Sequence, residues 1–280
     1  MPPWGRRSPT DSLLNVTACM LRNSYQTRGL SFAFLIGPPR NLSRQIGMGI
    51  HSAVCDVLGV DDIAFKYQPG ESQPSERTFS IHLTREDGRQ RFAVEIDQQA
   101  NQQPIRVLLG YEWPVSNKLV FDDFDAACDA AFEVLGDGWQ RVLAEARIRG
   151  QVHAPGGSAV SFLSRDVLGV SKEDRRIDER LSFTAIKYET VAADFARGSE
   201  LTNPKRDVSV EVLRQDSRSL YVEVMSQWPQ VAISPDGTVR VDPGTIRSFQ
   251  SPPSEYLLNT IDYTESVVLP FLDQTRTKRR

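Results

Sequence analysis

Two segments of the chain alternate apolar and polar residues, and they match each other without a gap. Residues 77–97 read RTFSIHLTREDGRQRFAVEID, and residues 206–226 read RDVSVEVLRQDSRSLYVEVMS, at a constant offset of 129 positions. A period of two is typical of a half-buried strand, and Asp87 with Gly88 is a turn signal where a hairpin needs one. Each segment is therefore predicted to form a β-hairpin with one apolar face, and the offset indicates an internal duplication.

The remaining pattern predicts the same order of elements in both halves. Ile46, Ile50 and Val54 are spaced by four, for example, which indicates a helix with one buried stripe. In the first half the predicted elements are strand 30–36, helix 42–58, strand 63–68, the hairpin, strand 105–113 and helix 121–135. In the second half they are strand 146–153, helix 158–168, strand 182–189, the hairpin, strand 239–249 and helix 254–272, after a helical segment 139–145 at the joint.

This order predicts an α+β fold made of two repeats of β-α-β-β-β-β-α. Antiparallel strands with one apolar face need cover, and the two helices of each repeat supply it. We expect one curved antiparallel sheet with the helices on one side and a pseudo-twofold axis. The predicted divisions are a loosely held arm (1–28), the first repeat (29–145), the second repeat (146–273) and a basic tail (274–280).

The element order resembles two known arrangements. One is the TATA-binding-protein type of fold, in which two repeats make one curved sheet with helices on its convex side. The other is the helix-grip fold, in which a long helix closes a sheet over a ligand cavity. The second half, with SFTAIKYE at 182–189 and a long terminal helix, also resembles a sporadically distributed bacterial family of unknown function. None of these resemblances implies a catalytic residue.

Composition narrows the class of protein. The 280 residues are 40% hydrophobic and 25% charged, which is typical of a globular chain with a substantial core, and no apolar run approaches the roughly 20 residues that a membrane span needs. The three cysteines have no spacing pattern and are expected to be reduced thiols, so we expect a cytoplasmic protein. Arginine outnumbers lysine, which is typical of a GC-rich bacterial genome. The net charge of -3 disfavours a nucleic-acid partner.

The sequence has no pattern typical of an enzyme or a metalloprotein. His51 and Cys55 stand four apart on a predicted helix, but a zinc site would need two further ligands. Cys128 follows two alanines on an apolar helix face, where a buried thiol is expected. There is no GxxxxGK phosphate loop. We therefore predict no catalytic residue, no metal and no cofactor.

The candidate binding residues are arginines at the hairpin tips and aromatic residues at strand ends. The arginines are Arg85, Arg89, Arg214 and Arg218, and the aromatic residues are Tyr111, Trp113 and Trp228, with Phe249. The arginines could touch a polyanion. The aromatic residues could fill the core or form an exposed surface for a partner, and the core interpretation is favoured.

The hypothesis for function is a non-enzymatic binding or assembly module. It would use the open face of the sheet or its edges to engage a protein partner or a second copy of itself. The outward positions of the two hairpins include Arg91, Glu95, Asp207 and Glu211, so that face is mixed or acidic and does not suit duplex nucleic acid. Two alternatives stay open: a small ligand in a helix-grip cavity, and nucleic acid at the arginine-tipped hairpins.

Overall fold

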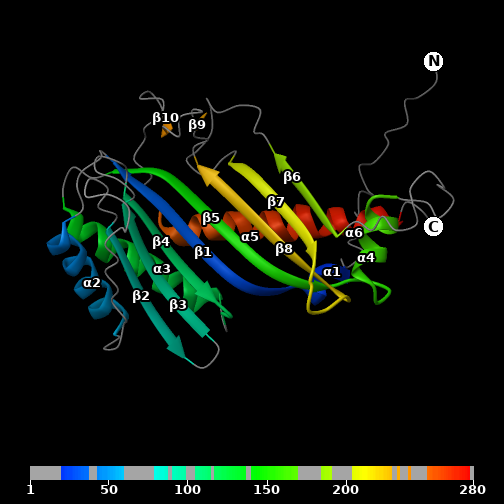
Figure 1. Cartoon of the computed structure of the whole chain (residues 1–280), viewed down its shortest axis with the longest axis horizontal. Helices are drawn as coiled ribbons and strands as arrows, with labels where there is room; N and C mark the ends of the chain where they lie inside the picture. The colour runs from blue at the N-terminus through cyan, green and yellow to red at the C-terminus, as the bar shows by residue number, and fades with distance from the viewer. Residues whose placement is uncertain are drawn as a thin grey trace, which may run out of the picture.

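In its described part the chain folds into a large antiparallel sheet packed against helices, beside a separate two-stranded sheet (Figure 1). The computed structural model describes residues 20–37, 43–59, 79–87, 90–98, 105–114, 117–136, 140–169, 184–190, 204–228, 232–233, 239–240 and 251–277. Side chains are described throughout these ranges except at a few positions, among them the whole of β2. The fold is therefore α+β with an open antiparallel sheet, as the alternating pattern predicts.

The sheet has eight strands in the order β2-β3-β4-β1-β5-β8-β7-β6. Each neighbouring pair is antiparallel. The strands are β1 (Gln26–Gly37), β2 (Phe79–Asp87), β3 (Gln90–Gln98), β4 (Ile105–Glu112), β5 (Gln140–His153), β6 (Ala185–Thr190), β7 (Lys205–Val212) and β8 (Ser219–Trp228). The two longest strands, β1 and β5, lie side by side at the centre and join the halves.

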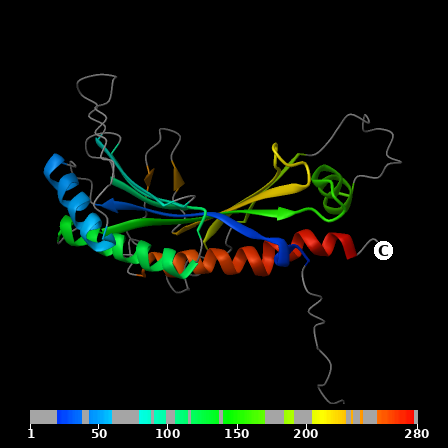
Figure 2. The same ribbon diagram turned by 90° about the horizontal axis from the view of Figure 1, so that it is seen from below.

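Helices cover one face of this sheet, as Figure 2 shows from the side. They are α1 (Met20–Ser24), α2 (Arg44–Leu58), α3 (Asn117–Leu135), α4 (Ala159–Ser161) with the π-helical turn η1 (Phe162–Val167), and α5 (Pro253–Tyr263), η2 (Thr264–Val268) and α6 (Leu269–Thr277). We call the face opposite α2, α3 and α5 the open face. None of the described helices is both long enough and apolar enough to cross a membrane.

Helix α2 shows how the local pattern selects its element. The Ser43 hydroxyl accepts a hydrogen bond from the Ile46 amide at 3.2 Å, which caps the first turn, and Gly59 ends the helix at φ 61°. Ile50 and Val54 are fully buried in the core. The predicted helix and its apolar stripe are confirmed.

The alternation of the hairpins is also confirmed wherever side chains are described. In β3, Phe92, Val94 and Ile96 are buried against the helices. In the other hairpin the same holds for Val208 and Val210 of β7. The polar residues between them face the open side, because successive side chains of a strand point to opposite faces.

Residues 140–145 form a strand and not the predicted helix 139–145, whose first residue lies outside the described residues. Residues from Gln140 onward belong to β5, which runs on to His153. Ala144, Ala146 and Ile148 are buried by strand alternation, with β1 on one side and β8 on the other. Alanine, leucine, arginine and glutamate are strong helix formers, but propensity is a weak prior that tertiary pairing overrides.

The C-terminal helix is interrupted at η2, where the prediction had one continuous helix. The hydroxyls of Thr260 and Thr264 donate to the carbonyls four residues earlier, at 3.0 and 2.8 Å, and Pro270 follows η2. Proline has no amide to give to the helix, and its ring crowds the carbonyl four residues before it. A widened π turn accommodates this local conflict.

The internal duplication stays a prediction. The two matching hairpins, β2–β3 and β7–β8, both lie in the sheet, but β8 pairs with β5 directly, whereas β4 separates β3 from β1. Of the segment expected to match β4, the structure describes only Val239–Arg240, which forms β10 and pairs with β9 (Ala232–Ile233) in a separate two-stranded sheet. The predicted strand 63–68 and residues 1–19 lie outside the described residues.

Candidate binding site on the open sheet face

A hollow lies on the open face over β3, β4, β1 and β5. Strand register places Ala93 beside Gly110, Gly110 beside Ser31, and Ser31 beside Arg147. Three of these four neighbours are among the smallest residues, so the surface sinks where they meet. The resulting cavity has a volume of about 200 Å³.

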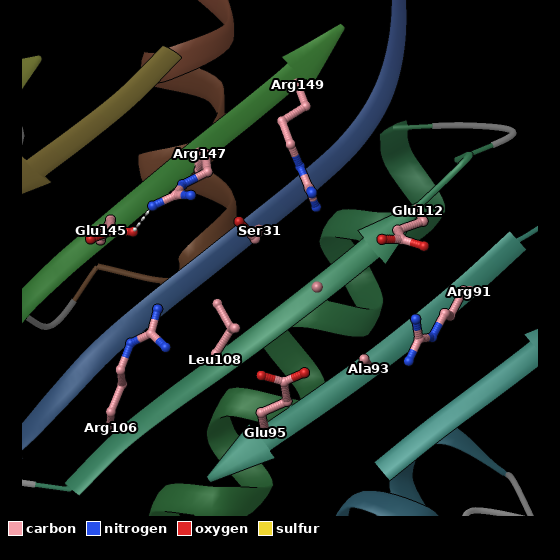
Figure 3. A pocket seen from close by; sticks show the side chains of 11 residues that line it. Ser31, Arg91, Ala93, Glu95, Arg106, Leu108, Glu112, Glu145, Arg147 and Arg149 are labelled. Atoms are coloured by element: carbon pink, nitrogen blue, oxygen red, sulfur yellow. Dashed lines mark hydrogen bonds and ion pairs between the residues drawn. The ribbon is translucent and has the colours of Figure 1, made fainter. Parts of the chain in front are cut away.

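Gly110 sets the depth of this hollow. A Cβ atom built on Gly110 would meet no other atom within 4 Å. The space above Gly110 is therefore open, and a longer side chain at this position would enter it. Figure 3 shows the labelled side chains around the unlabelled centre of β4.

Charged side chains surround the hollow on all sides (Figure 3). They are Arg91, Glu95, Arg106, Glu112, Glu145, Arg147 and Arg149. The strand register explains one side of this rim. Arg91 of β3 lies opposite Glu112 of β4, and Gly29 of β1 lies between Glu112 and Arg149 of β5. With four arginines and three glutamates, the rim is mixed in sign with a surplus of one positive charge.

Arg149 lies across the backbone of β1. A Cβ atom on Gly29 would stand 3.0 Å from Nε and 3.1 Å from Nη2 of Arg149, so a larger residue at position 29 would crowd this side chain and force it to shift. Nε is buried and has no hydrogen-bond partner. Within the described residues, neither Arg149 nor Arg106 makes a hydrogen bond or an ion pair with another side chain.

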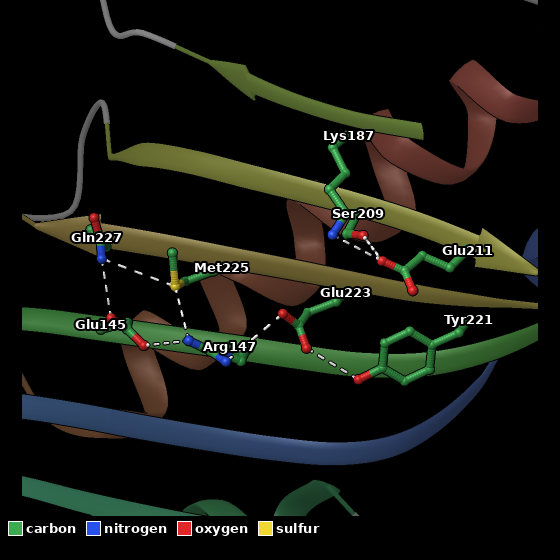
Figure 4. Close-up of polar contacts among 9 residues, drawn as sticks. All are labelled: Glu145, Arg147, Lys187, Ser209, Glu211, Tyr221, Glu223, Met225 and Gln227. Carbon is green, nitrogen blue, oxygen red and sulfur yellow. Dashed lines mark hydrogen bonds and ion pairs between the residues drawn. The ribbon is translucent and has the colours of Figure 1, made fainter. Parts of the chain in front are cut away.

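Arg147, by contrast, is held by several partners. It donates to Glu145 at 3.1 Å, contacts the sulfur of Met225 at 3.2 Å and lies 3.8 Å from Glu223 (Figure 4). Gln227 donates to the second oxygen of Glu145 at 3.1 Å. The Arg147 side of the rim is thereby fixed in place.

Tyr221 extends this network along β8. Its hydroxyl donates to Glu223 at 3.1 Å. Burial, and then the negative charge of Glu223, raise the pKa of Tyr221 to about 12. Tyr221 therefore stays neutral and acts as a hydrogen-bond donor at any ordinary pH.

The predicted aromatic residues separate into two groups. Tyr111 and Trp228 are core residues, 6% and 2% exposed, as the core interpretation expects. Trp113 is 46% exposed, has a φ of 58° and carries the guanidinium of Arg28 at 4.5 Å from its ring centre. Phe249 lies outside the described residues. A role of any of them in binding stays a prediction.

The structure describes only part of the arginines predicted at the hairpin tips. Arg214 and Arg218 are exposed in the turn between β7 and β8, whereas the side chain of Arg85 and the whole of Arg89 lie outside the described residues. Between β3 and β8 lie β4, β1 and β5, so four strand spacings, about 19 Å, separate the hairpins. The structure therefore places only the side chains of Arg214 and Arg218, and a basic surface at the two tips stays a prediction.

One serine-histidine-aspartate group does not have the arrangement of a catalytic triad. Ser219 Oγ donates to Asp216 Oδ2 at 2.5 Å and lies 2.8 Å from His153 Nδ1, and Ser219 is fully buried. The hydrogen bond from Ser219, followed by one from the Arg218 amide, lowers the pKa of Asp216. In a catalytic triad the histidine lies between the serine and the aspartate, whereas here Ser219 lies between Asp216 and His153, so the group ties the β7–β8 turn to β5.

The cysteine and histidine candidates stay within the packing of their helices. Cys55 Sγ lies 3.7 Å from His51 Nε2 on α2, and Cys128 is fully buried on α3. Among the described residues, no three histidine, cysteine, aspartate or glutamate side chains gather closely enough to hold a metal ion.

Sequence reasoning missed most of the hollow. Arg91, Ala93 and Glu95 could be placed on the outward face from the alternation of their hairpin. Arg106 lies on β4 and Arg149 on β5. They meet at the hollow because β1 pairs with both strands in the observed register. No local signal in the sequence carries that register.

Comparison with known proteins does not place the chain in a family. No protein-family model matches the sequence, and no curated protein matches it. A crystal structure of the di-domain ARO/CYC BexL from the BE-7585A biosynthetic pathway aligns with 90% of this chain and 100% of that chain, at 9% identity and a TM-score of 0.22. At that TM-score the likeness is too weak to support an argument about fold or function.

Proposed function

We propose that this protein is a non-enzymatic binding module that engages a protein partner through the open face of its sheet. The observation that carries the proposal is the hollow on that face, with its charged rim and with two arginines that make no hydrogen bond or ion pair within the described residues. Arginine is enriched at protein interfaces, where it meets carboxylates and carbonyls of a partner.

The mixed signs of the rim favour a protein over nucleic acid. A surface that grips phosphates carries a concentrated positive charge, but here three glutamates stand among four arginines. Further along the open face, Glu211 of β7 pairs with Lys187 of β6 at 3.1 Å. A surface of both signs is complementary to another protein surface of both signs.

The hollow also lies on the open face of the sheet, whereas a helix-grip ligand would bind on the face that the helices cover. Such a ligand would lie between the sheet and the long helix. In the described residues Phe32, Tyr256 and Trp228 pack against one another in that layer, with ring centres 5.4 and 5.1 Å apart. The described cavity is polar and faces away from these rings. The proposal therefore rests on the open face.

Site-specific photo-crosslinking in the source cell tests the proposal. A photoreactive phenylalanine analogue replaces Leu108, which lines the hollow, and Glu133, which is exposed on α3 at the opposite face, serves as the matched control. We expect a discrete crosslinked product from position 108 only, lost when Arg149→Glu is added. A product of twice the chain mass would identify a second copy as the partner.

Two results would contradict the proposal. One is the absence of any product from position 108 and from a second open-face position, Met225. The other is an equal product from Glu133, because the contact would then not be specific to the open face.

A further inference from the structure

We propose that the hollow is a binding site for an oxyanion, a carboxylate or phosphate group, with Arg149 as its principal donor and Arg106 as a second. This inference deepens the proposed function and rests on it only in treating the open face as a binding surface. The anionic group could belong to a free small molecule or to an acidic side chain of the partner, and the test separates these sources.

The state of Arg149 is the first step of the argument. Its Nε is buried and unpartnered, although a guanidinium N–H is a strong donor. A buried donor without an acceptor is costly, and the cost is removed when an acceptor binds. The glycine at position 29 leaves room for the guanidinium across β1, where it lies at the rim of the hollow (Figure 3).

The charge balance is the second step. Of the rim residues, Arg147 and Glu145 already satisfy each other. Within the described residues, the rim groups with neither a hydrogen bond nor an ion pair are Arg106, Arg149 and Glu112, which leaves a surplus of one positive charge. A guanidinium edge matches the two oxygens of a carboxylate or phosphate with parallel hydrogen bonds, so an oxyanion fits this surplus better than a cation or an apolar group.

The shape of the hollow is the third step. A volume of about 200 Å³ accepts a small anionic group but not a large apolar ligand. The floor of Ala93, Gly110 and Ser31 lets that group descend to the level of the guanidinium groups around it. The Ser31 hydroxyl is a further polar group on this floor.

Calorimetric titration of the full chain with citrate and with an acetylated hexaglutamate peptide, at low ionic strength, tests the inference. Arg149→Met should weaken binding at least tenfold, and Gly110→Met should weaken it to a similar extent by filling the hollow. Glu112→Gln should tighten it, because one repelling carboxylate is neutralised. Arg165→Met, at an exposed arginine of η1 outside the hollow, is the matched control and should leave binding unchanged.

The outcomes also distinguish the two sources of the anion. Citrate binding without peptide binding would indicate a free small molecule, whereas peptide binding that also suppresses the crosslink at Leu108 would indicate an acidic segment of the partner. If Arg149→Met fails to fold, two other variants carry the test. Arg149→Lys keeps the positive charge at position 149, and Gly110→Met leaves every charged rim residue in place.

The inference is overturned if wild-type protein binds neither probe, or if Arg165→Met loses as much affinity as Arg149→Met. A crosslink at Leu108 that persists in either case would leave the protein-binding proposal standing, so the two proposals can fail separately.

Discussion

The two halves of the open face carry similar residues in different states. Over β5, β8, β7 and β6 the charges neutralise each other: Arg147 with Glu145 and Glu223, Lys187 with Glu211, and Lys205 with Glu189 and Asp207. At the hollow, by contrast, Arg106 of β4 and Arg149, which extends from β5 over Gly29 of β1, have no such partners in the described residues. Charged side chains that pair with each other make a stable solvated surface. Unpaired arginines can still donate hydrogen bonds to a bound ligand.

The largest expected effect tests whether the two halves share one core. Trp228 comes from β8 of the second half, yet it packs edge-on against Tyr256 in the core that contains β1 and β4, with ring centres 5.1 Å apart. Trp228→Ala should lower the free energy of unfolding by about 3–5 kcal/mol. Chemical denaturation followed by circular dichroism measures it, with the half-exposed Trp113→Ala as the matched control, expected to lose far less.

Two separate unfolding transitions in the wild-type protein would contradict this prediction. The two halves would then unfold independently and would not share one core.

A second prediction compares two glycines on opposite faces of the sheet. A Cβ atom on Gly150 would overlap the ring of Tyr25, whereas one on Gly110 meets nothing within 4 Å. Gly150→Ala should therefore lower the unfolding free energy by about 1–3 kcal/mol through overpacking. Gly110→Ala should be neutral or stabilise by up to about 1 kcal/mol, because alanine loses less entropy than glycine in a strand.

Thermal melting of the two alanine variants checks this pair. Equal losses would show that the space above Gly110 is not open, and the hollow would lose its physical basis.

The third prediction compares the paired and unpaired arginines directly. Arg147→Met removes contacts to two glutamates and should lower the unfolding free energy by up to about 1 kcal/mol, as for partly exposed ion pairs. Arg149→Met removes no ion pair and relieves a buried unpartnered N–H, so it should be neutral or stabilising. Urea denaturation of the two variants measures the difference, and a larger loss for Arg149→Met would reverse the comparison.

The smallest effect concerns the exposed pair Lys187–Glu211. Hydrogen bonds from Lys187 and then Ser209 lower the pKa of Glu211. A lowered pKa means that the folded state favours the carboxylate, so this contribution to stability is present above the unfolded pKa. It is lost as the pH falls through the lower folded value. Carboxyl NMR should show the pKa of Glu211 rising toward its ordinary value in Lys187→Ala, with little change in stability because solvent screens the pair. An unchanged pKa would mean that the pair does not form in solution.

Much of the fold could be predicted from local patterns. The alternation around Phe92 and Val208 identified strands and their buried faces, and the spacing through Ile50 and Val54 identified α2. The local pattern failed at 140–145, where helix-forming residues lie in a central strand. It failed there because pairing with β1 and β8, which come from distant parts of the chain, outweighs intrinsic propensity.

The sequence by itself determined which side chains of β3 and β7 face the helices, because that choice depends only on a period of two within the strand. Only the tertiary structure decided that Ala93, Gly110 and Ser31 meet in one row and that Arg149 crosses β1 at Gly29. These encounters depend on the register between strands far apart in the chain, and a shift of one residue would send every side chain to the other face.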